Sequence, residues 1–292
     1  MQDIREKRKA ISSGAPIAHE TGRWLVVGRV GWLLLLALIL VPFAQSLPTY
    51  RDSFTNPAPQ STLLSPPVVA ALARVGISLD AYAWISLGVM GAVVVFSLIV
   101  ALVLFLRRSN DWMALLVSLF IVIYTVGSVN GGVSGAASAV PAHASVLQMA
   151  LASAQSALLF ALTTGVAFLF PSGRFVPRMS WVVLIGASVW GAAIAAVPLL
   201  GGGLLFLGYP IVVGACVASI VYRYRRISTP VERLQTRWIV AGFIVTLLGN
   251  QVFWLPSAFT PLGQTLYPLI VYQIYQLSLA LVPITFFIAV QR

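Results

Sequence analysis

The chain has 292 residues, of which 59% are hydrophobic and only 9% are charged, with a formal net charge of +11. Soluble domains carry roughly a quarter charged residues, so the composition excludes an ordinary water-soluble protein. Apolar runs of about 20 residues recur, and each is long enough to cross about 30 Å of hydrocarbon. The sequence therefore predicts an all-α, polytopic bundle of transmembrane helices.

The first element is a basic tail, residues 1–23, which contains "REKRKA" and leads into a span near residues 24–46. This apolar run is longer than the 7–15 residues of a signal peptide, so we expect an uncleaved anchor. Residues 47–81 follow as an extracytoplasmic loop with five prolines. Within this loop, "LSPPVVAALARVG" predicts one short amphipathic helix.

Seven further spans complete a transmembrane domain that covers residues 24–292. The third and fifth spans of the chain are the shortest. The third runs into the small, polar stretch "VGSVNGGVSGAASAVPAHAS". About eight spans are therefore expected, with seven as the alternative. The further spans lie near residues 82–106, 112–130, 147–170, 181–199, 204–223, 238–258 and 266–289.

The basic residues predict the orientation. Of the 18 Lys and Arg residues, only Arg51 and Arg74 fall outside the tail, the alternate loops that share its side and the adjoining span ends. By the positive-inside rule both termini are cytoplasmic. The same dispersal among loops, without a base-reading motif, argues against nucleic acid as a partner. The expected surroundings are the lipid bilayer, and we expect a bacterial plasma (inner) membrane.

The turn after the second span, "RRSNDW", is read as a tight hairpin. Ser109 or Asn110 is the expected cap of the third helix, and Asp111 suits the positive end of its dipole. Arg29, near the inner end of the first span, is expected to extend to the lipid headgroups.

The stretch "VYRYRRISTPVERLQTRW", residues 221–238, concentrates five arginines between two apolar runs. Its "TPVE" segment predicts a helix start, with Thr229 as N-cap, Pro230 at the first helical position and Glu232 at the third. Arg233 and Arg237 then share one face of a helix that continues into the seventh span. These two arginines either fix the orientation in the membrane and contact lipid headgroups, or they form a docking surface for a cytoplasmic domain. In the second case they are candidates for signal relay.

Amides and aromatic side chains occupy the outer half of the last two spans. They form either interhelical hydrogen bonds, worth about 0.6 kcal/mol each on average in a membrane, or a signal-binding pocket that opens to the outside. The candidate binding residues are Asn250, Gln251, Trp254, Tyr272, Gln273, Tyr275 and Gln276.

Small residues repeat at four-residue intervals on two other spans. Such rows let helix backbones approach closely. They indicate internal packing, with a homodimer interface as the alternative. The rows are Ser153, Ala157, Ala161 and Gly165 on the fourth span, and Ala187, Gly191 and Ala195 on the fifth.

Catalytic chemistry finds little support. All seven acidic residues lie outside the predicted spans, and the chain has no HExxH, P-loop, CxxC or G-x-S-x-G motif. Cys216 is the single cysteine, so no intramolecular disulfide can form. We expect no enzyme activity in this chain, no catalytic residue, no metal and no cofactor.

Three segments resemble the membrane-embedded input region of a group of bacterial sensor histidine kinases. They read "RRSNDWMALLVSLFIV", "LFPSGRFVPR" and "RYRRISTPVERLQTRWIVAG". Members of that group carry similar loops, "LFPDGRFVPRW" and "RYRRVS-P-ERQQTKWV", in the same order. The resemblance covers about residue 24 to Arg292, and "GISLDAYAWISLGV" before the second span also matches.

The chain departs from that group in two ways. Residues 47–81 lack the pair of cysteines often found there, and "FFIAVQR" stands where an "AILRYRLWDID"-like helix leads into signalling modules. No phosphoacceptor or ATP-binding motif occurs in residues 1–292. The resemblance thus implies the input module of a two-component system, either as a fragment or as a stand-alone protein. Its expected partner is a cytoplasmic kinase transmitter or a response-regulator system.

Two other functions remain open, a small-solute transporter or channel and a structural membrane subunit. The absence of intramembrane charge and of paired broken helices counts against a transporter. For a sensor, the last span is the expected output element. Pro283 predicts a kink there, because proline removes one backbone hydrogen bond. The kink either relays a signal or only shapes packing.

Overall fold

The computed structural model describes residues 22–57, 61, 63–129, 146–170, 173, 175, 179–196, 198–226 and 228–291. This part of the chain is all-α, as predicted, and contains no strand. In chain order its elements are α2 (Gly22–Thr55), α3 (Pro66–Arg74), α4 (Leu79–Arg108), α5 (Trp112–Val129), α7 (Val146–Leu169), α8 (Ser180–Ala196), α9 (Pro198–Arg226), α10 (Pro230–Phe259), the 3-10 turn η1 (Pro261–Gln264), α11 (Tyr267–Ser278) and α12 (Leu281–Gln291).

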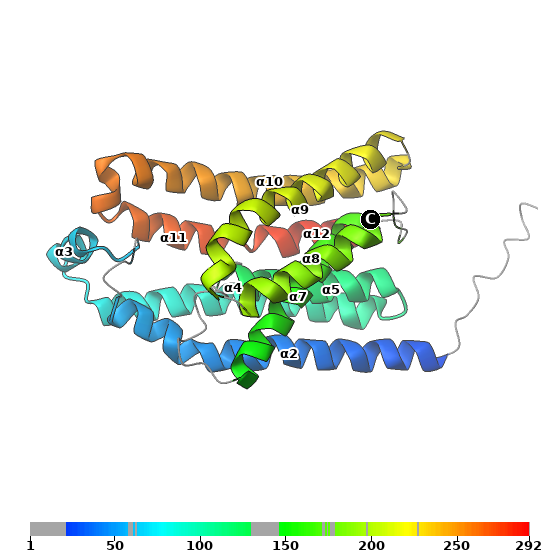
Figure 1. The fold of residues 1–292 in the computed structure, drawn as a ribbon, viewed down its shortest axis with the longest axis horizontal. Coiled ribbons are helices and arrows are strands. Elements are labelled where there is room, and N and C mark those ends of the chain that lie inside the picture. Colours follow the sequence, from blue (N-terminus) through cyan, green and yellow to red (C-terminus); the bar gives the residue numbers. More distant parts are fainter. Residues whose placement is uncertain are drawn as a thin grey trace, which may run out of the picture.

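The long helices α2, α4, α5 and α10 run along the long axis of the molecule, and α11 and α12 continue one another along the same direction (Figure 1). Helix α3 lies at one end of this bundle, which we call the α3 end. The α4–α5 and α9–α10 turns lie at the opposite end, which we call the turn end.

Several helices are of membrane-spanning length. Five described segments are long and apolar enough to cross a bilayer, and they coincide with the first four and the last of the predicted spans. Most of the predicted fifth span lies in α8, and the predicted sixth and seventh spans lie in α9 and α10. The five segments are Val26–Thr55, Leu79–Arg108, Trp112–Val129, Met149–Leu169 and Tyr267–Val290.

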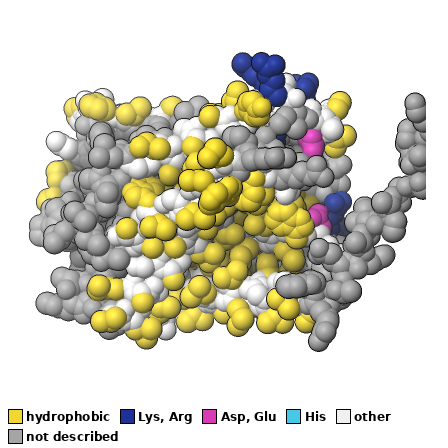
Figure 2. All heavy atoms as spheres, turned by 45° about the vertical axis from the view of Figure 1, so that its right-hand side comes forward, with side chains coloured by type: hydrophobic (Ala, Val, Ile, Leu, Met, Phe, Trp, Pro, Cys, Tyr) yellow, Lys and Arg dark blue, Asp and Glu magenta, His cyan; other side chains and the backbone are white. Residues whose placement is uncertain are grey.

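The surface agrees with this assignment. Hydrophobic side chains cover the middle of the face seen in Figure 2, while the charged side chains of that view gather at one end. Large apolar side chains stay exposed on the long helices, among them Leu34 at 66%, Ile99 at 55% and Leu106 at 67%. Such an apolar girdle is unfavourable in water and is what a helix presents to lipid.

Helix α2 is longer than predicted. It continues to Thr55, past the expected end at residue 46, although it contains Pro42 and Pro48. Because proline has no N–H, Pro42 cannot bond the carbonyl of Leu38 in the preceding turn. The amide nitrogen of Gln155 on α7 donates to that carbonyl at 3.1 Å and to the carbonyl of Ile39 at 3.3 Å. A neighbouring side chain thus satisfies the backbone group that the proline leaves open.

The α9–α10 turn has the predicted helix start. The Thr229 hydroxyl accepts from the backbone N–H of Glu232, whose carboxylate accepts from the backbone N–H of Thr229, and Pro230 opens the helix. This reciprocal capping box confirms the prediction from "TPVE".

The expected cap of the third predicted helix was wrong. The cap of α5 is the Asp111 carboxylate, which accepts from Met113 N–H at 2.9 Å. Ser109 and Asn110 instead accept from the Arg29 guanidinium at 2.8 and 3.0 Å. Arg29 therefore bonds the α4–α5 turn, where headgroup contact was expected.

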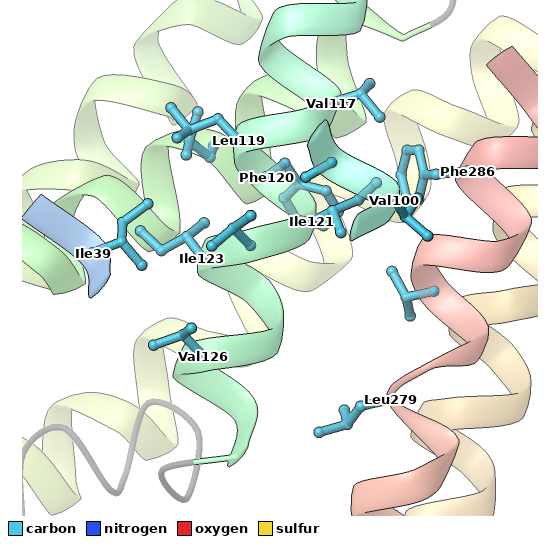
Figure 3. Packing of buried hydrophobic residues seen from close by; sticks show 14 of the residues in the cluster. Ile39, Val100, Val117, Leu119, Phe120, Ile121, Ile123, Val126, Leu279 and Phe286 are labelled. Carbon is cyan, nitrogen blue, oxygen red and sulfur yellow. The ribbon is translucent and has the colours of Figure 1, made fainter. Parts of the chain in front are cut away.

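Helix α5 is the centre of the core. Two-thirds of its residues are buried, a larger share than in the other four segments of membrane-spanning length. Phe120 and Ile121 are fully buried, between Ile39 of α2 on one side and Phe286 of α12 on the other (Figure 3). The first and last long helices of the chain are therefore held together through α5.

The rows of small residues pack α7 against α8. A Cβ on Gly191 of α8 would lie 2.8 Å from the backbone oxygen of Ser156 and would overlap the Phe160 ring, so only glycine allows this approach. Ala187 is 2% exposed, and Gly165 faces Leu184. The internal-packing reading accounts for these residues.

Candidate functional site

Polar side chains from three helices meet near the α3 end. Tyr272, Gln273 and Gln276 come from α11, the first part of the last predicted span, and they meet residues of α2 and α4. Two hydrogen-bonded groups, which the Phe54 ring contacts on both sides, make up a set that we call the tyrosine–glutamine cluster. Its members are Tyr50, Tyr82, Ser86, Tyr272, Gln273 and Gln276.

One half of the cluster joins α11 to α2. The amide nitrogen of Gln276 donates to the Tyr50 hydroxyl at 2.9 Å. The Tyr50 hydroxyl also shares a hydrogen bond of 2.7 Å with that of Tyr272. Gln276 is fully buried, so these contacts are shielded from solvent.

The other half joins α11 to α4. The amide nitrogen of Gln273 donates to the Ser86 hydroxyl at 2.7 Å and to the Tyr82 hydroxyl at 3.1 Å. The Tyr82 hydroxyl donates to the backbone carbonyl of Leu269 at 3.4 Å. Both amide nitrogens of the cluster are therefore engaged.

The two amide oxygens are not engaged. Oε1 of Gln273 and Oε1 of Gln276 are buried, and neither has a hydrogen-bond partner among the described residues. An unpaired buried acceptor costs about 1–3 kcal/mol, and most buried polar groups are paired. Two unpaired amide oxygens within one helical turn are thus an unusual feature of this core.

Helix α3 and the last turn of α2 cover the cluster. Phe54 is 3% exposed, and the centroid of its ring lies 5.0 Å from that of Tyr50, 5.6 Å from Tyr82 and 6.1 Å from Tyr272. Val68 and Leu72 of α3 pack in the same apolar group. The polar cluster is therefore covered by one aromatic side chain, Phe54, and by the aliphatic side chains of Val68 and Leu72.

The structure brings together only part of the predicted binding set. Tyr272, Gln273 and Gln276 lie in the cluster, whereas Tyr275 is half-buried and packs against the central core. The backbones of Asn250, Gln251 and Trp254 lie in α10, but their side chains are outside the described part of the structure.

Sequence reasoning missed the partners of α11. Tyr50, Tyr82 and Ser86 belong to α2 and α4, whereas the predicted binding set lay entirely on the last two spans. Tyr50 was assigned to a loop, because the first span was expected to end before Pro48. The sequence did contain one signal: Tyr50 follows the first apolar run by only a few residues, and no charged residue separates the two.

The last predicted span is interrupted close to Pro283, the residue at which a kink was predicted. Helix α11 ends at Ser278 and α12 begins at Leu281, with Pro283 in its first turn. Bonds of the 3-10 type replace the regular pattern at the break, from Ala280 N–H to Leu277 O at 3.1 Å and from Val282 N–H to Leu279 O at 3.3 Å. Gln276 therefore lies on the last turn before the break.

Below the break, α12 packs through Phe286. This side chain is fully buried, and its ring contacts those of Phe120, Phe243 and Phe170 at centroid distances of 5.3, 6.1 and 5.9 Å. A displacement of α12 would therefore change its packing against α5, α10 and the end of α7 together.

The predicted relay arginines lie at the turn end. The guanidinium groups of Arg233 and Arg237 each lie 5.8 Å from the centroid of the Tyr224 ring, and Arg237 Nε donates to the Tyr224 hydroxyl at 2.8 Å. Both arginines are exposed, and they brace the α9–α10 hairpin.

A third arginine holds this hairpin to α7. Arg223 is only 4% exposed, and its guanidinium donates to the backbone carbonyls of Phe168 and Phe170 at the end of α7. It thus caps carbonyls that the end of the helix leaves without intrahelical partners.

Ionisable groups are scarce near the cluster. The Arg51 guanidinium and the Asp80 carboxylate, which flank it, are paired with each other at 2.5 Å, and Arg51 lies over the Trp84 ring. No group of His, Cys, Asp or Glu side chains in the described part of the chain has a metal-binding arrangement. The cluster offers hydrogen bonding without charge. Comparison with known protein-family models, curated proteins and solved structures finds no match for this chain.

Proposed function

We propose that this protein is the membrane input module of a two-component signalling system and that the tyrosine–glutamine cluster detects the signal. The observation that carries the proposal is the position of Gln276. It joins α2 to α11, has an unpaired buried oxygen, and lies on the turn that precedes the break into α12. A change in the hydrogen bonding of Gln276 therefore acts next to the break between α11 and α12.

The proposal includes the finer topology. Eight spans, with both termini in the cytoplasm of a bacterium, place the cluster near the outer surface and the end of α12 near the inner surface. The one-sided basic residues support this orientation. The similarity of the three loop segments to sensor kinases supports the link to a transmitter.

Transport is the alternative from a different class. A transporter or channel of the usual kind has intramembrane charge or paired broken helices at a central site. Only the α11–α12 pair is clearly interrupted among the described spans, and the cluster has no charged member. These observations favour sensing over transport, and they favour sensing over a purely structural subunit because two buried acceptors are left unpaired.

A transmitter fusion tests the proposal. A known histidine-kinase transmitter is joined after Arg292 of the full chain, and autophosphorylation is measured in native membranes. We expect Gln276→Leu to change basal output at least about fivefold, a typical allosteric coupling, and Pro283→Ala to change it in the same assay. Gln155→Leu, a matched change in a glutamine that bonds backbone carbonyls, should leave output at the wild-type level. Wild-type output from the Gln276 and Pro283 variants, at equal protein abundance, contradicts the proposal.

A further inference from the structure

The unpaired groups of the cluster have a common chemistry. Both amide nitrogens are engaged, and both amide oxygens are buried without partners in the described structure. An amide oxygen can accept two hydrogen bonds and donates none. An occupant that satisfies Gln273 and Gln276 must therefore donate hydrogen bonds.

The occupant should also be neutral. No member of the cluster is charged at neutral pH, the flanking Arg51 and Asp80 neutralise each other, and Asp52 of the same turn of α2 is exposed at the surface. An ammonium ion brought into this environment would lose its hydration without gaining a counter-ion, which is strongly unfavourable. A neutral donor such as a hydroxyl, an amide N–H or an indole N–H avoids this cost, because it carries no charge that must be dehydrated.

The walls of the cluster suit a flat apolar body. The ring of Phe54 already lies against the rings of Tyr50, Tyr82 and Tyr272, with centroid distances between 5.0 and 6.1 Å. Phe54 is the last residue but one of α2, so its side chain is held at the end of a helix. It fills the space between the rings of the three tyrosines that belong to the cluster.

The cover over this space is a small element. Val68 and Leu72 are the only two fully buried residues of the nine-residue α3. The helix ends in a complete Schellman turn, where Gly76 adopts φ 77° and Ile77 N–H bonds Leu72 O at 3.2 Å. Val69 of α3 packs against the same apolar group. A helix this short, held by three side chains, can move away as a unit.

We propose that the tyrosine–glutamine cluster is a binding site for a small neutral molecule with a flat apolar body and one hydrogen-donating group. The donating group bonds the free oxygen of Gln276, and the body displaces the Phe54 ring beneath α3. If the protein is the proposed sensor, a molecule of this class is the signal that it detects. The site itself does not depend on signalling.

Fluorine NMR of the purified full chain in nanodiscs tests this site. The probes are 4-fluorophenol, which donates a hydrogen bond, 4-fluoroanisole, which only accepts, and 4-fluorobenzylamine, which is cationic. We expect saturable binding of 4-fluorophenol, about tenfold tighter than that of the other two probes, because one buried hydrogen bond supplies a factor of this size. Phe54→Ala should tighten 4-fluorophenol binding by clearing the space between the tyrosine rings.

Variants in the Phe54→Ala background separate this site from partition into lipid. Gln276→Leu should abolish the preference for 4-fluorophenol, and the matched Gln155→Leu should keep it. If Phe54→Ala does not fold, Phe54→Leu replaces it. Equal binding of the three probes, tighter binding of the amine, or no saturable binding overturns the proposal. A clear preference combined with unchanged output from the transmitter fusion would leave the site standing and reject sensing.

Discussion

Gln276 and Tyr50 are 226 positions apart in the sequence, and the Gln276 amide nitrogen donates to the Tyr50 hydroxyl at 2.9 Å. This bond joins the first and the last of the helices long enough to cross a membrane. It is formed at the α3 end, one turn before the break that separates α11 from α12. The contact therefore connects the covered cluster to the helix that leads to the C-terminus.

Gln276, which is buried, and Gln155, which is partly buried, should respond in opposite ways to the same substitution. Gln276→Leu removes a bond worth about 0.6 kcal/mol in a membrane and also removes an unpaired oxygen that costs about 1–3 kcal/mol. We expect its unfolding free energy to stay level or to rise by about 1 kcal/mol. Gln155→Leu exposes the carbonyl of Leu38 and should lower that free energy by about 1–2 kcal/mol. Reversible unfolding in mixed micelles measures both, and a large loss in Gln276→Leu would assign that residue to packing.

The close contact of α7 and α8 predicts an asymmetry between two glycines of α8. Gly191→Ala places a methyl group against the Ser156 backbone and the Phe160 ring, and should destabilise the protein by about 1–3 kcal/mol. Gly186→Ala meets no atom within 4 Å and should be neutral or slightly stabilising. Thermal unfolding compares the two. A Gly191 variant that keeps its stability but loses a dimer would favour the homodimer reading of this row.

The crossing of α10 and α12 predicts a rescue. A Cβ on Gly242 would overlap the Thr285 hydroxyl and lie 2.9 Å from its methyl carbon. Gly242→Ala should therefore destabilise the packing by about 1–3 kcal/mol, and Thr285→Ala should recover at least half of that loss in the double variant. A double-mutant cycle gives the coupling energy. Strict additivity of the two changes would show that the helices do not meet at this pair.

The proposed orientation predicts opposite labelling of two exposed valines. Val75 follows α3 and is 59% exposed, and Val231 lies in the first turn of α10 and is 56% exposed. In a Cys216→Ala background, an impermeant thiol reagent added to intact cells should label Val75→Cys and spare Val231→Cys. After permeabilisation both should react. Labelling of position 231 in intact cells would reverse the topology.

Local features of this fold could be predicted from the sequence. The Thr229 capping box, the short helix that became α3 and the break near Pro283 each depend on residues within a few positions of one another. The apolar runs likewise predicted the helices, because length and composition alone decide whether a helix can cross a bilayer.

The partners of the cluster could not be predicted in this way. The residues of a span do not determine which helices are its neighbours, so a candidate set limited to the last two spans left out Tyr50 and Tyr82. The end of α2 was misplaced because residues 47–81, with five prolines, were assigned to a loop, whereas α2 continues through Pro48 to Thr55. Both errors concern tertiary packing, which sequence spacing does not specify.

The central claim is that the cluster controls the position of α12, and spin-label distances test it most directly. Labels at positions 106 and 288 report α4 against α12 on the full chain in nanodiscs, with Cys216 replaced by Ala. We predict that Gln276→Leu shifts the mean distance by about 2 Å, the size of a typical helix shift between states, while Gln155→Leu leaves the distribution unchanged. Superimposable distributions for wild type and Gln276→Leu would contradict the account.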